Sequence, residues 1–276
     1  MSNHNPENHL IISCAVIGAE VSEAVYPHIP RNPEELVESA VAAVAAGASI
    51  IHLHVRDDNN LPTQSVERFA LVSKKIKERC DCIVQFSTGG AAGTPVDLRC
   101  APLVLRPEMA TLSLGTMNFG DGIFENSEQT IKSIAKSIVE NGVLPELEIF
   151  DFGMLETAWR YLAKGIIPAK FHMDFVLGVP GGMSGTISNL VTLASNLHPE
   201  QSWSVAGIGR FQLPLTMCAI AMNGHVRVGI EDNVYYRKGE FAKSNAQFVE
   251  RVARLSKEAN RPVADVKTAR KILGLK

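Results

Sequence analysis

Apolar runs alternate with longer amphipathic segments along the whole chain. Most of the runs are continuous and rich in Val and Ile, which is typical of parallel strands covered on both faces. Eight of them predict strands at residues 10–18, 48–56, 81–88, 109–117, 144–152, 171–179, 202–209 and 225–232. The pattern therefore indicates an α/β protein built on a parallel sheet.

Helix signals fill the segments between these runs. Asn32 and Pro33 open one periodic segment and Gly47 follows its end, which is the usual order of N-cap, first-turn Pro and terminal Gly. Ser65 opens a second helix, and the basic residues at its end complement the helix dipole. Further helices are expected at residues 127–141, 154–164, 186–196, 212–222, 243–260 and 265–273, whereas the connection "DLRCAPLVLRPE" is abbreviated.

Eight strands, each followed by a helix, predict a TIM (β/α)8 barrel. The length of 276 residues suits this fold, which usually takes about 250 residues. An open, doubly wound sheet uses the same alternation and stays an alternative. No linker, low-complexity tract or charge block divides the chain, so we expect residues 1–276 to form one domain.

Polar side chains gather near the C-terminal ends of the predicted strands, where TIM barrels carry their active sites. The second strand shows this best, because it begins with apolar residues and ends in "HLHVR". Residues of this kind follow or end five of the other strands: Glu20, Ser87, Thr111, Glu148, Arg227, Glu231 and Asp232. Their position at the same end of many strands predicts one shared cavity.

His52 and His54 are two residues apart, so their side chains point to the same side of the strand. Two neutral imidazoles in this arrangement can bind one divalent ion. Glu231 is the best third ligand, because the eighth strand closes the barrel beside the first. Two core histidines hydrogen-bonded to their neighbours would explain the spacing equally well, since H-x-H alone is a weak signal.

The segment "HVRVGIEDN" at residues 225–233 is the strongest chemical cluster. An arginine keeps a neighbouring carboxylate ionised and burial raises its basicity, so Arg227 and Asp232 can form a general base. A structural salt bridge at the barrel rim is the alternative. Glu148 has two possible roles, which are to support a metal ligand or to shuttle a proton.

Glycines follow the hydroxyl pair in "QFSTGGAAGTP" at residues 85–95. Backbone N–H groups at Gly89 and Gly90 can converge with Ser87 on a carboxylate, although a tight turn explains the glycines as well. The segments "GVPGGMSG" (178–185) and "AGIGR" (206–210) can be turns or can lie along a phosphate-bearing cofactor.

Composition and charge argue against several classes of protein, namely nucleic-acid-binding, secreted and membrane proteins. The net charge of -2 lacks the excess of positive charge that is typical of proteins that bind nucleic acid or an anionic membrane surface. The N-terminal "MSNHNPENHL" lacks the features of a signal peptide, and no apolar stretch is long enough to span a bilayer. The five cysteines are scattered, as expected for reduced thiols. We therefore expect a soluble, cytoplasmic protein.

Segments along nearly the whole chain resemble the β-keto acid cleavage enzymes. They are "GAE" (18–20), "IHLHVRDD" (51–58), "VQFSTGG" (84–90), "RPEMATLSLGTMNFGD" (106–121), "VLGVPGGMSG" (176–185), "WSVAGIGR" (203–210) and "GHVRVGIEDNVYY" (224–236). Together they are far more specific than any one motif. The resemblance implies a TIM barrel, usually a homotetramer, with one divalent ion such as Zn²⁺, that condenses a β-keto acid with acetyl-CoA to give acetoacetate and a new acyl-CoA.

The resemblance also assigns roles to individual positions. His52, His54 and Glu231 would bind the metal, and Asp232 with Arg227 would deprotonate the keto acid. Ser87, Gly89, Gly90 and Thr111 would hold the substrate carboxylate, while Glu148 and Ser87 would assist the later steps. Glu20 would contact the ammonium group of 3-keto-5-aminohexanoate, a substrate of lysine fermentation, or of another cationic β-keto acid. A brace for the first loop is the alternative role of Glu20.

Two other functions fit the residues alone. A metal-dependent TIM-barrel hydrolase can use the H-x-H pair, but such enzymes recruit further histidines, and His172 and His225 are predicted at strand starts. A non-enzymatic barrel that binds a CoA ester or a small anion would not need the metal. Metal analysis and an assay of acetoacetate formation separate these functions.

Overall fold

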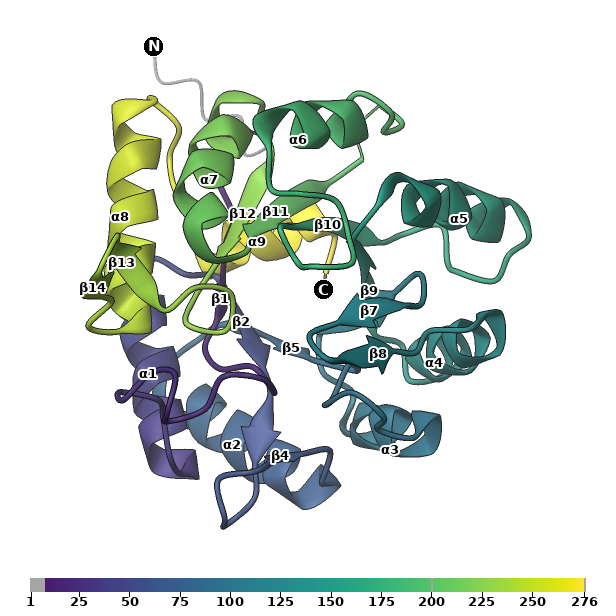
Figure 1. Cartoon of the computed structure of the whole chain (residues 1–276), viewed down its shortest axis with the longest axis horizontal. Coiled ribbons are helices and arrows are strands. Elements are labelled where there is room, and N and C mark those ends of the chain that lie inside the picture. Colours follow the sequence, from purple (N-terminus) through teal and green to yellow (C-terminus); the bar gives the residue numbers. More distant parts are fainter. Residues whose placement is uncertain (1–7, 200, 276) are drawn as a thin grey trace.

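The computed structural model describes residues 8–199 and 201–275, and within them eight parallel strands form a closed barrel (Figure 1). The order around the barrel is β1-β12-β11-β10-β9-β6-β5-β2. The strands are β1 (Ile12–Ala15), β2 (Ile50–Leu53), β5 (Ile83–Phe86), β6 (Met109–Ser113), β9 (Leu144–Ile149), β10 (His172–Leu177), β11 (Trp203–Gly207) and β12 (His225–Val228). The prediction of a TIM barrel is confirmed, and the open doubly wound sheet is excluded.

Helices surround the barrel and pack their apolar faces against it (Figure 1). They are α1 (Pro33–Ala45), α2 (Val66–Arg79), α3 (Val96–Cys100), α4 (Glu128–Glu140), α5 (Phe152–Ala163), α6 (Ile187–Ala194), α7 (Gln212–Ala221) and α8 (Asn245–Glu258). The connection with α3 is short, as predicted, and continues into a 3-10 turn at Ala101–Leu105. Among the described residues, no helix combines the length and the apolarity that crossing a membrane requires.

Side-chain caps fix where several helices begin. The side chains of Asn32 and Ser65 accept hydrogen bonds from the backbone N–H groups of Glu35 and Arg68, as their positions in the sequence predicted. Such a cap satisfies a backbone donor that has no partner within the helix and stabilises it by about 1 kcal/mol. The N-terminal residues 1–7, on which part of the targeting prediction depends, lie outside the described residues.

Helix α9 (Val266–Leu273) closes the N-terminal end of the barrel, behind the strands in Figure 1. Ala269 and Leu273 of this helix pack against a layer of inward-facing side chains, which are Ile11, Ile50, Ile83, Met109 and Leu144. Two residues further along β2, β5 and β9, the buried side chains are His52, Gln85 and Glu146. The interior therefore changes from apolar to polar toward the C-terminal ends of the strands, as the sequence of the second strand predicted.

The strands end earlier than the apolar runs predicted, and loops and hairpins occupy the C-terminal rim. Hairpins β3 (Val55–Arg56) with β4 (Pro62–Thr63), β7 (Met117–Phe119) with β8 (Gly122–Phe124), and β13 (Tyr235–Arg237) with β14 (Glu240–Phe241) follow β2, β6 and β12. The run at 109–117 is thus a strand to Ser113, and its end belongs to a hairpin. This rim surrounds the candidate site.

Candidate active site and metal centre

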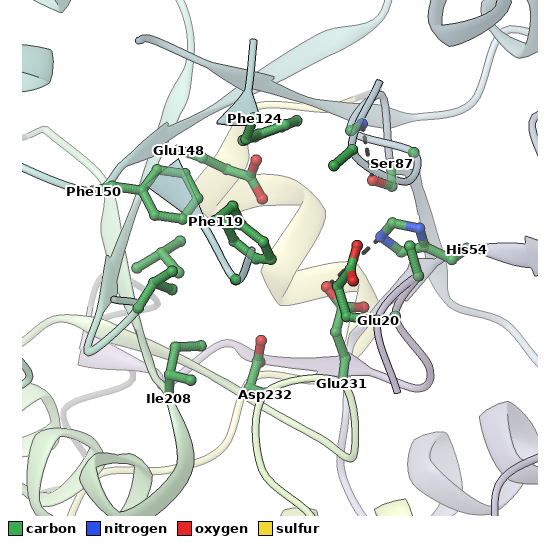
Figure 2. A pocket seen from close by; sticks show the side chains of 18 of the residues that line it. Glu20, His54, Ser87, Phe119, Phe124, Glu148, Phe150, Ile208, Glu231 and Asp232 are labelled. Carbon is green, nitrogen blue, oxygen red and sulfur yellow. Dashed lines mark hydrogen bonds and ion pairs between the residues drawn. The ribbon is translucent and has the colours of Figure 1, made fainter. Parts of the chain in front are cut away.

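A cavity of about 300 Å³ opens among the C-terminal ends of the barrel strands. Most of the predicted site residues line it (Figure 2), and they are Glu20, His54, Ser87, Gly89, Gly90, Glu148, Arg227, Glu231 and Asp232. His52 is buried behind this lining and reaches Glu231. Thr111 is fully buried and is not among the lining residues.

His52, His54 and Glu231 converge on one point. Nε2 of His52 lies 3.5 Å from Oε1 of Glu231, and Nε2 of His54 lies 3.7 Å from the same oxygen. One potential ligand atom from each residue lies within 4.8 Å of the other two. Nε2 of His52 and Oε2 of Glu231 are buried without a hydrogen-bond partner. Buried polar atoms are normally paired, so this donor set fits a divalent ion.

Gln85 sets the orientation of the His52 ring. Its Oε1 lies 2.6 Å from Nδ1 of His52, and an amide oxygen can only accept, so Nδ1 carries the proton. The lone pair of Nε2 therefore points toward Glu231 and the metal position. A hydrogen bond to the second nitrogen of a ligating histidine commonly fixes its tautomer in metal sites.

Burial and charge oppose each other at the three ligands. Burial, the largest effect, lowers the pKa of His54 to about 4. Burial would also lower the pKa of His52, but the neighbouring Glu231 carboxylate outweighs it and raises that pKa. Burial opposes ionisation of Glu231, whereas His52 and Arg227 hold its pKa well below the usual range. Glu231 is therefore an anion, and the neutral His54 ring is available as a ligand.

Arg227 is the centre of a buried ionic network. It donates to Asp232 through Nε at 3.1 Å and Nη2 at 2.9 Å, and to Glu231 at 2.6 Å. Its Nη1 lies 3.3 Å from Glu148 and 3.9 Å from Asp174. Four carboxylates thus surround one guanidinium. The excess of negative charge is a second feature that fits a divalent cation beside them.

Asp232 combines a buried carboxylate with a fixed orientation. Burial raises its pKa to about 6, although Arg227 acts in the opposite direction. A carboxylate with this pKa is a better base than an exposed one and is ionised near neutral pH. The geometry therefore allows the general-base role that the sequence predicted for Asp232.

A tight turn after β12 presents Glu231 and Asp232. Gly229 has a φ of 152°, and a Cβ on it would lie 2.0 Å from the carbonyl oxygen of Ala15. The N–H of Glu231 donates to Ala15 and the N–H of Asp232 donates to Gly229. Only glycine permits this close approach of two barrel strands. The turn places both acids at the rim instead of on an extended strand.

The turn at residues 87–90 contributes a hydroxyl and backbone groups to the cavity. Oγ of Ser87 accepts a hydrogen bond from the N–H of Gly89, and Gly90 has a positive φ of 67°. The hydroxyl of Thr111 accepts from the N–H of Thr88 and supports this turn from within the barrel. Thr111 is therefore placed to shape the turn, whereas Ser87, Gly89 and Gly90 face the cavity.

The first loop carries Glu20 to the edge of the cavity, above Glu231 in Figure 2. Arg56 braces this loop by donating to the carbonyl oxygens of Gly18 and Val21, at 2.7 and 2.6 Å. Arg56 therefore supports the loop, and the Glu20 carboxylate is exposed at the cavity. This placement favours a ligand-contacting role for Glu20 over a purely structural one.

Several residues of the site were not predicted from the sequence. Gln85 was hidden in an apolar run, and its only signal was an amide inside a buried strand. Arg99 is buried and joins the carbonyl oxygens of Thr88 and Glu125. The aromatic lining by Phe119, Phe124 and Phe150 carried no recognisable signal.

The other buried histidines stay away from the metal group. Nδ1 of His225 accepts a hydrogen bond from the N–H of Ile11, and His172 lies between the hydroxyls of Ser202 and Ser204. Both residues are at strand starts, as predicted. The metal group among the described residues therefore consists of His52, His54 and Glu231, without the additional histidines of the hydrolase alternative.

Fold and site together define a TIM barrel with a candidate divalent-metal centre at its C-terminal face. The family model described as beta-keto acid cleavage enzyme matches residues 9–275. The chain belongs to this family, whose members are enzymes. The resemblance seen in the sequence is thereby confirmed.

Two similar relatives are named 3-keto-5-aminohexanoate cleavage enzyme. The one from Acetoanaerobium sticklandii is 50% identical over 96% of this chain and 98% of its own length, and the one from Fusobacterium nucleatum is 51% identical over 97% and 98%. A relative from Cupriavidus necator, 3-oxoadipate:acetyl-CoA acetyltransferase, is 38% identical over 96% and 94%. The family thus includes relatives named for quite different keto acids.

Among solved structures, apo ObcA has a similar fold. It superposes with a TM-score of 0.80 at 19% identity, over 90% of this chain and 66% of the ObcA chain. At this identity the likeness supports the barrel fold alone.

Proposed function

We propose that this protein transfers the acyl group of a β-keto acid to CoA. A β-keto acid and acetyl-CoA would give acetoacetate and a new acyl-CoA. The observation that carries the proposal is the convergence of His52, His54 and Glu231 beside the Arg227–Asp232 pair at one cavity. Family membership and the acetyl-CoA named for a relative support the same reaction.

His52, His54 and Glu231 would hold one divalent ion, which we take to be Zn²⁺. When bound, such an ion supplies Lewis-acid stabilisation for negative charge on a keto oxygen. The protein groups then have separate tasks. Gln85 keeps the His52 ring in the ligating orientation, and Arg227 keeps Glu231 ionised.

Asp232 would begin the reaction by taking a proton from the carbon between the keto and carboxylate groups. Arg227 holds the Asp232 carboxylate through two hydrogen bonds, so the base needs no reorientation during proton transfer. The product of this step is an enolate, and the proton stays on Asp232.

The enolate carbon would then attack the acetyl carbonyl carbon of acetyl-CoA, and the CoA thiolate would leave. The thiolate next adds to the original keto carbon, and the bond between this carbon and its neighbour breaks. The released acetoacetate carbanion takes up the proton from Asp232. Glu148 and Ser87 would assist these steps by hydrogen bonding to the carbonyl oxygens on which negative charge develops. The hydroxyl of Ser113 holds Glu148 in place at 2.6 Å.

The substrate carboxylate would lie against Ser87, Gly89 and Gly90. The hydroxyl of Ser87 and the backbone of this turn face the cavity, and Thr111 supports the turn from below. Backbone donors of a glycine-rich turn bind anions without a charged side chain. This end of the cavity therefore fixes the position of the keto acid.

Glu20 would select the substrate by its charge. Its carboxylate lies at the opening and forms no ion pair with another described residue, so a positively charged substituent can pair with it. The substrate would be 3-keto-5-aminohexanoate or another cationic β-keto acid. In this role the protein would belong to amino acid degradation, as in lysine fermentation.

The remaining parts of the proposal concern the molecule as a whole. We take residues 1–276 as one catalytic domain, and the protein as a cytoplasmic homotetramer. Free cysteines at five positions are consistent with a reducing compartment. Sedimentation analysis of the purified protein tests the tetramer.

The deciding experiment incubates the purified protein with acetyl-CoA and a panel of cationic, neutral and anionic β-keto acids, and measures acetoacetate. Metal content is measured on the same sample. We expect turnover with an aminated substrate and about one divalent ion per chain. His52→Ala should lose both the ion and the activity. A metal-free protein that binds acetyl-CoA without turnover would contradict the proposal and favour a binding function.

A further inference from the structure

The cavity has two chemically different sides (Figure 2). One side carries Glu20, His54 and Ser87. The opposite side is mostly apolar and carries Phe119, Phe124, Phe150, Val176, Val179 and Ile208, which we call the apolar wall. In Figure 2 the carboxylate of Glu148 lies beside Phe124 and Phe150 on this side. The reaction steps described above place no group of the keto acid against this wall.

Glycines allow the apolar wall to close. Hairpin β7–β8 supplies Phe119 and Phe124, and the turn at residues 178–183 supplies Val179. Gly181 has a φ of 106°, and a Cβ on it would lie 2.2 Å from the carbonyl oxygen of Asn118 in the hairpin. The hairpin and the turn can therefore meet only because this residue is glycine. The segment "GVPGGMSG" thus shapes a wall of the cavity.

Polar contacts hold the same wall in place. The N–H of Met183 donates to the carbonyl oxygen of Phe150 at 2.8 Å, and Arg99 donates to the carbonyl oxygen of Glu125 at the foot of the hairpin. The guanidinium of Arg99 also lies over the ring of Phe124, 5.2 Å from its centroid. These contacts within the protein give the wall a defined shape, as is usual for small-molecule sites.

We propose that the apolar wall binds the acetyl-thioester end and the pantetheine arm of acetyl-CoA. This inference rests on the proposed function. A carboxylate placed on the wall would lose its hydration and lie near the Glu148 carboxylate, whereas a thioester is uncharged. A cavity of about 300 Å³ is at the small end of ligand sites, so it admits the acyl end and leaves the nucleotide outside.

The position of Asp232 supports this assignment. In Figure 2 its carboxylate lies between Ile208 of the wall and Glu231 of the metal group. An enolate formed at Asp232 thus has the metal group on one side and the wall on the other. The acetyl carbonyl carbon would approach from the wall, which places the two reacting carbons next to each other.

The test compares Phe119→Ala with Ile123→Ala. Both residues belong to the same hairpin, but Phe119 lines the cavity and Ile123 is 60% exposed and is not among the lining residues. We expect Phe119→Ala to raise the KM for acetyl-CoA about tenfold, with the KM for the keto acid within twofold of the wild type. Ile123→Ala should leave both values unchanged. Acetyl-pantetheine, which lacks the nucleotide, should show the same tenfold effect.

Other outcomes overturn the proposal. It fails if Phe119→Ala changes mainly the KM for the keto acid, if Ile123→Ala has an equal effect, or if the effect disappears with acetyl-pantetheine. Thermal unfolding shows whether the hairpin variant is folded, and Val179→Ala repeats the test from the other part of the wall. Failure of the proposed function looks different, because the wild type itself would then form no acetoacetate.

Discussion

His52 and Gln85 face each other across neighbouring barrel strands, with Nδ1 of the imidazole 2.6 Å from the amide Oε1. Both side chains are almost completely buried, at 1% and 0% exposure. Water therefore cannot replace Gln85 as the partner of Nδ1. The direction of Nε2, which faces Glu231, and the tautomer of the ring depend on this one hydrogen bond.

We expect Gln85→Leu to weaken metal binding about 10- to 100-fold, because the His52 ring loses the partner that orients it. Competition with a chelator of known affinity measures the change. Gln201→Leu is the matched control, since its amide donates to Phe171 and Ser202 at the opposite end of the barrel. Equal metal affinity in Gln85→Leu and the wild type would show that the hydrogen bond has no part in the site.

Asp232→Asn should separate proton transfer from metal binding. The amide keeps the size of the side chain but cannot act as a base, so we expect kcat to fall about 10²- to 10⁴-fold with unchanged metal content. Exchange of deuterium into the keto acid without acetyl-CoA reports the first step directly and should be lost. Asp151→Asn, at the N-cap of α5, is the control. Loss of the ion in Asp232→Asn would instead make Asp232 part of the metal site.

Glu20→Gln should change substrate choice. Removing the negative charge is expected to lower kcat/KM about tenfold for cationic β-keto acids and to leave neutral ones within about twofold. The measurement compares pairs of substrates that differ only in the charged group. Glu23→Gln, an exposed acid of the same loop, is the control. An equal loss on neutral substrates would mean that Glu20 only shapes the loop.

The sequence was sufficient to predict the barrel and the proximity of His52, His54 and Glu231, because strand periodicity and barrel closure together bring them to one end of neighbouring strands. Alternation fixes His52 and His54 on one side of a strand, and the closure of eight strands brings the last one beside the first. Glu231 follows the last strand, and the turn at Gly229 brings its Oε1 to 3.5 and 3.7 Å from Nε2 of His52 and His54. Predictions of this kind need no knowledge of the depth of a residue inside the barrel.

Some features of the site could not be predicted, because they depend on strand register and on how deeply a side chain is buried in the barrel. Gln85 contacts His52 because β2 and β5 pair in a register that places these two residues side by side. Thr111 is fully buried and is not among the residues that line the cavity, and its hydroxyl accepts from the N–H of Thr88. The hairpin with Phe119 was hidden, because its first residues continue the apolar run of the preceding strand.

Glu146 shows how a buried acid influences stability. It is 1% exposed, its Oε1 has no hydrogen-bond partner, and Oε2 lies 4.0 Å from Nε2 of His172. Burial, reinforced by the nearby Asp174 carboxylate, raises the pKa of Glu146 from 4.5 to about 8. The folded protein therefore keeps this proton at a pH at which the unfolded chain has lost it.

The consequence is a pH-dependent effect of Glu146→Gln. Below about pH 4.5 the acid is protonated in both states and adds no pH dependence. Between pH 4.5 and about 8 only the unfolded chain ionises, so the wild type loses unfolding free energy as pH rises, and glutamine does not. Urea unfolding should show the variant gaining at least about 1 kcal/mol relative to the wild type from pH 5 to pH 8. Glu140→Gln, at an exposed site, should show no such trend, and a flat difference for Glu146→Gln would mean that its carboxyl ionises normally in the fold.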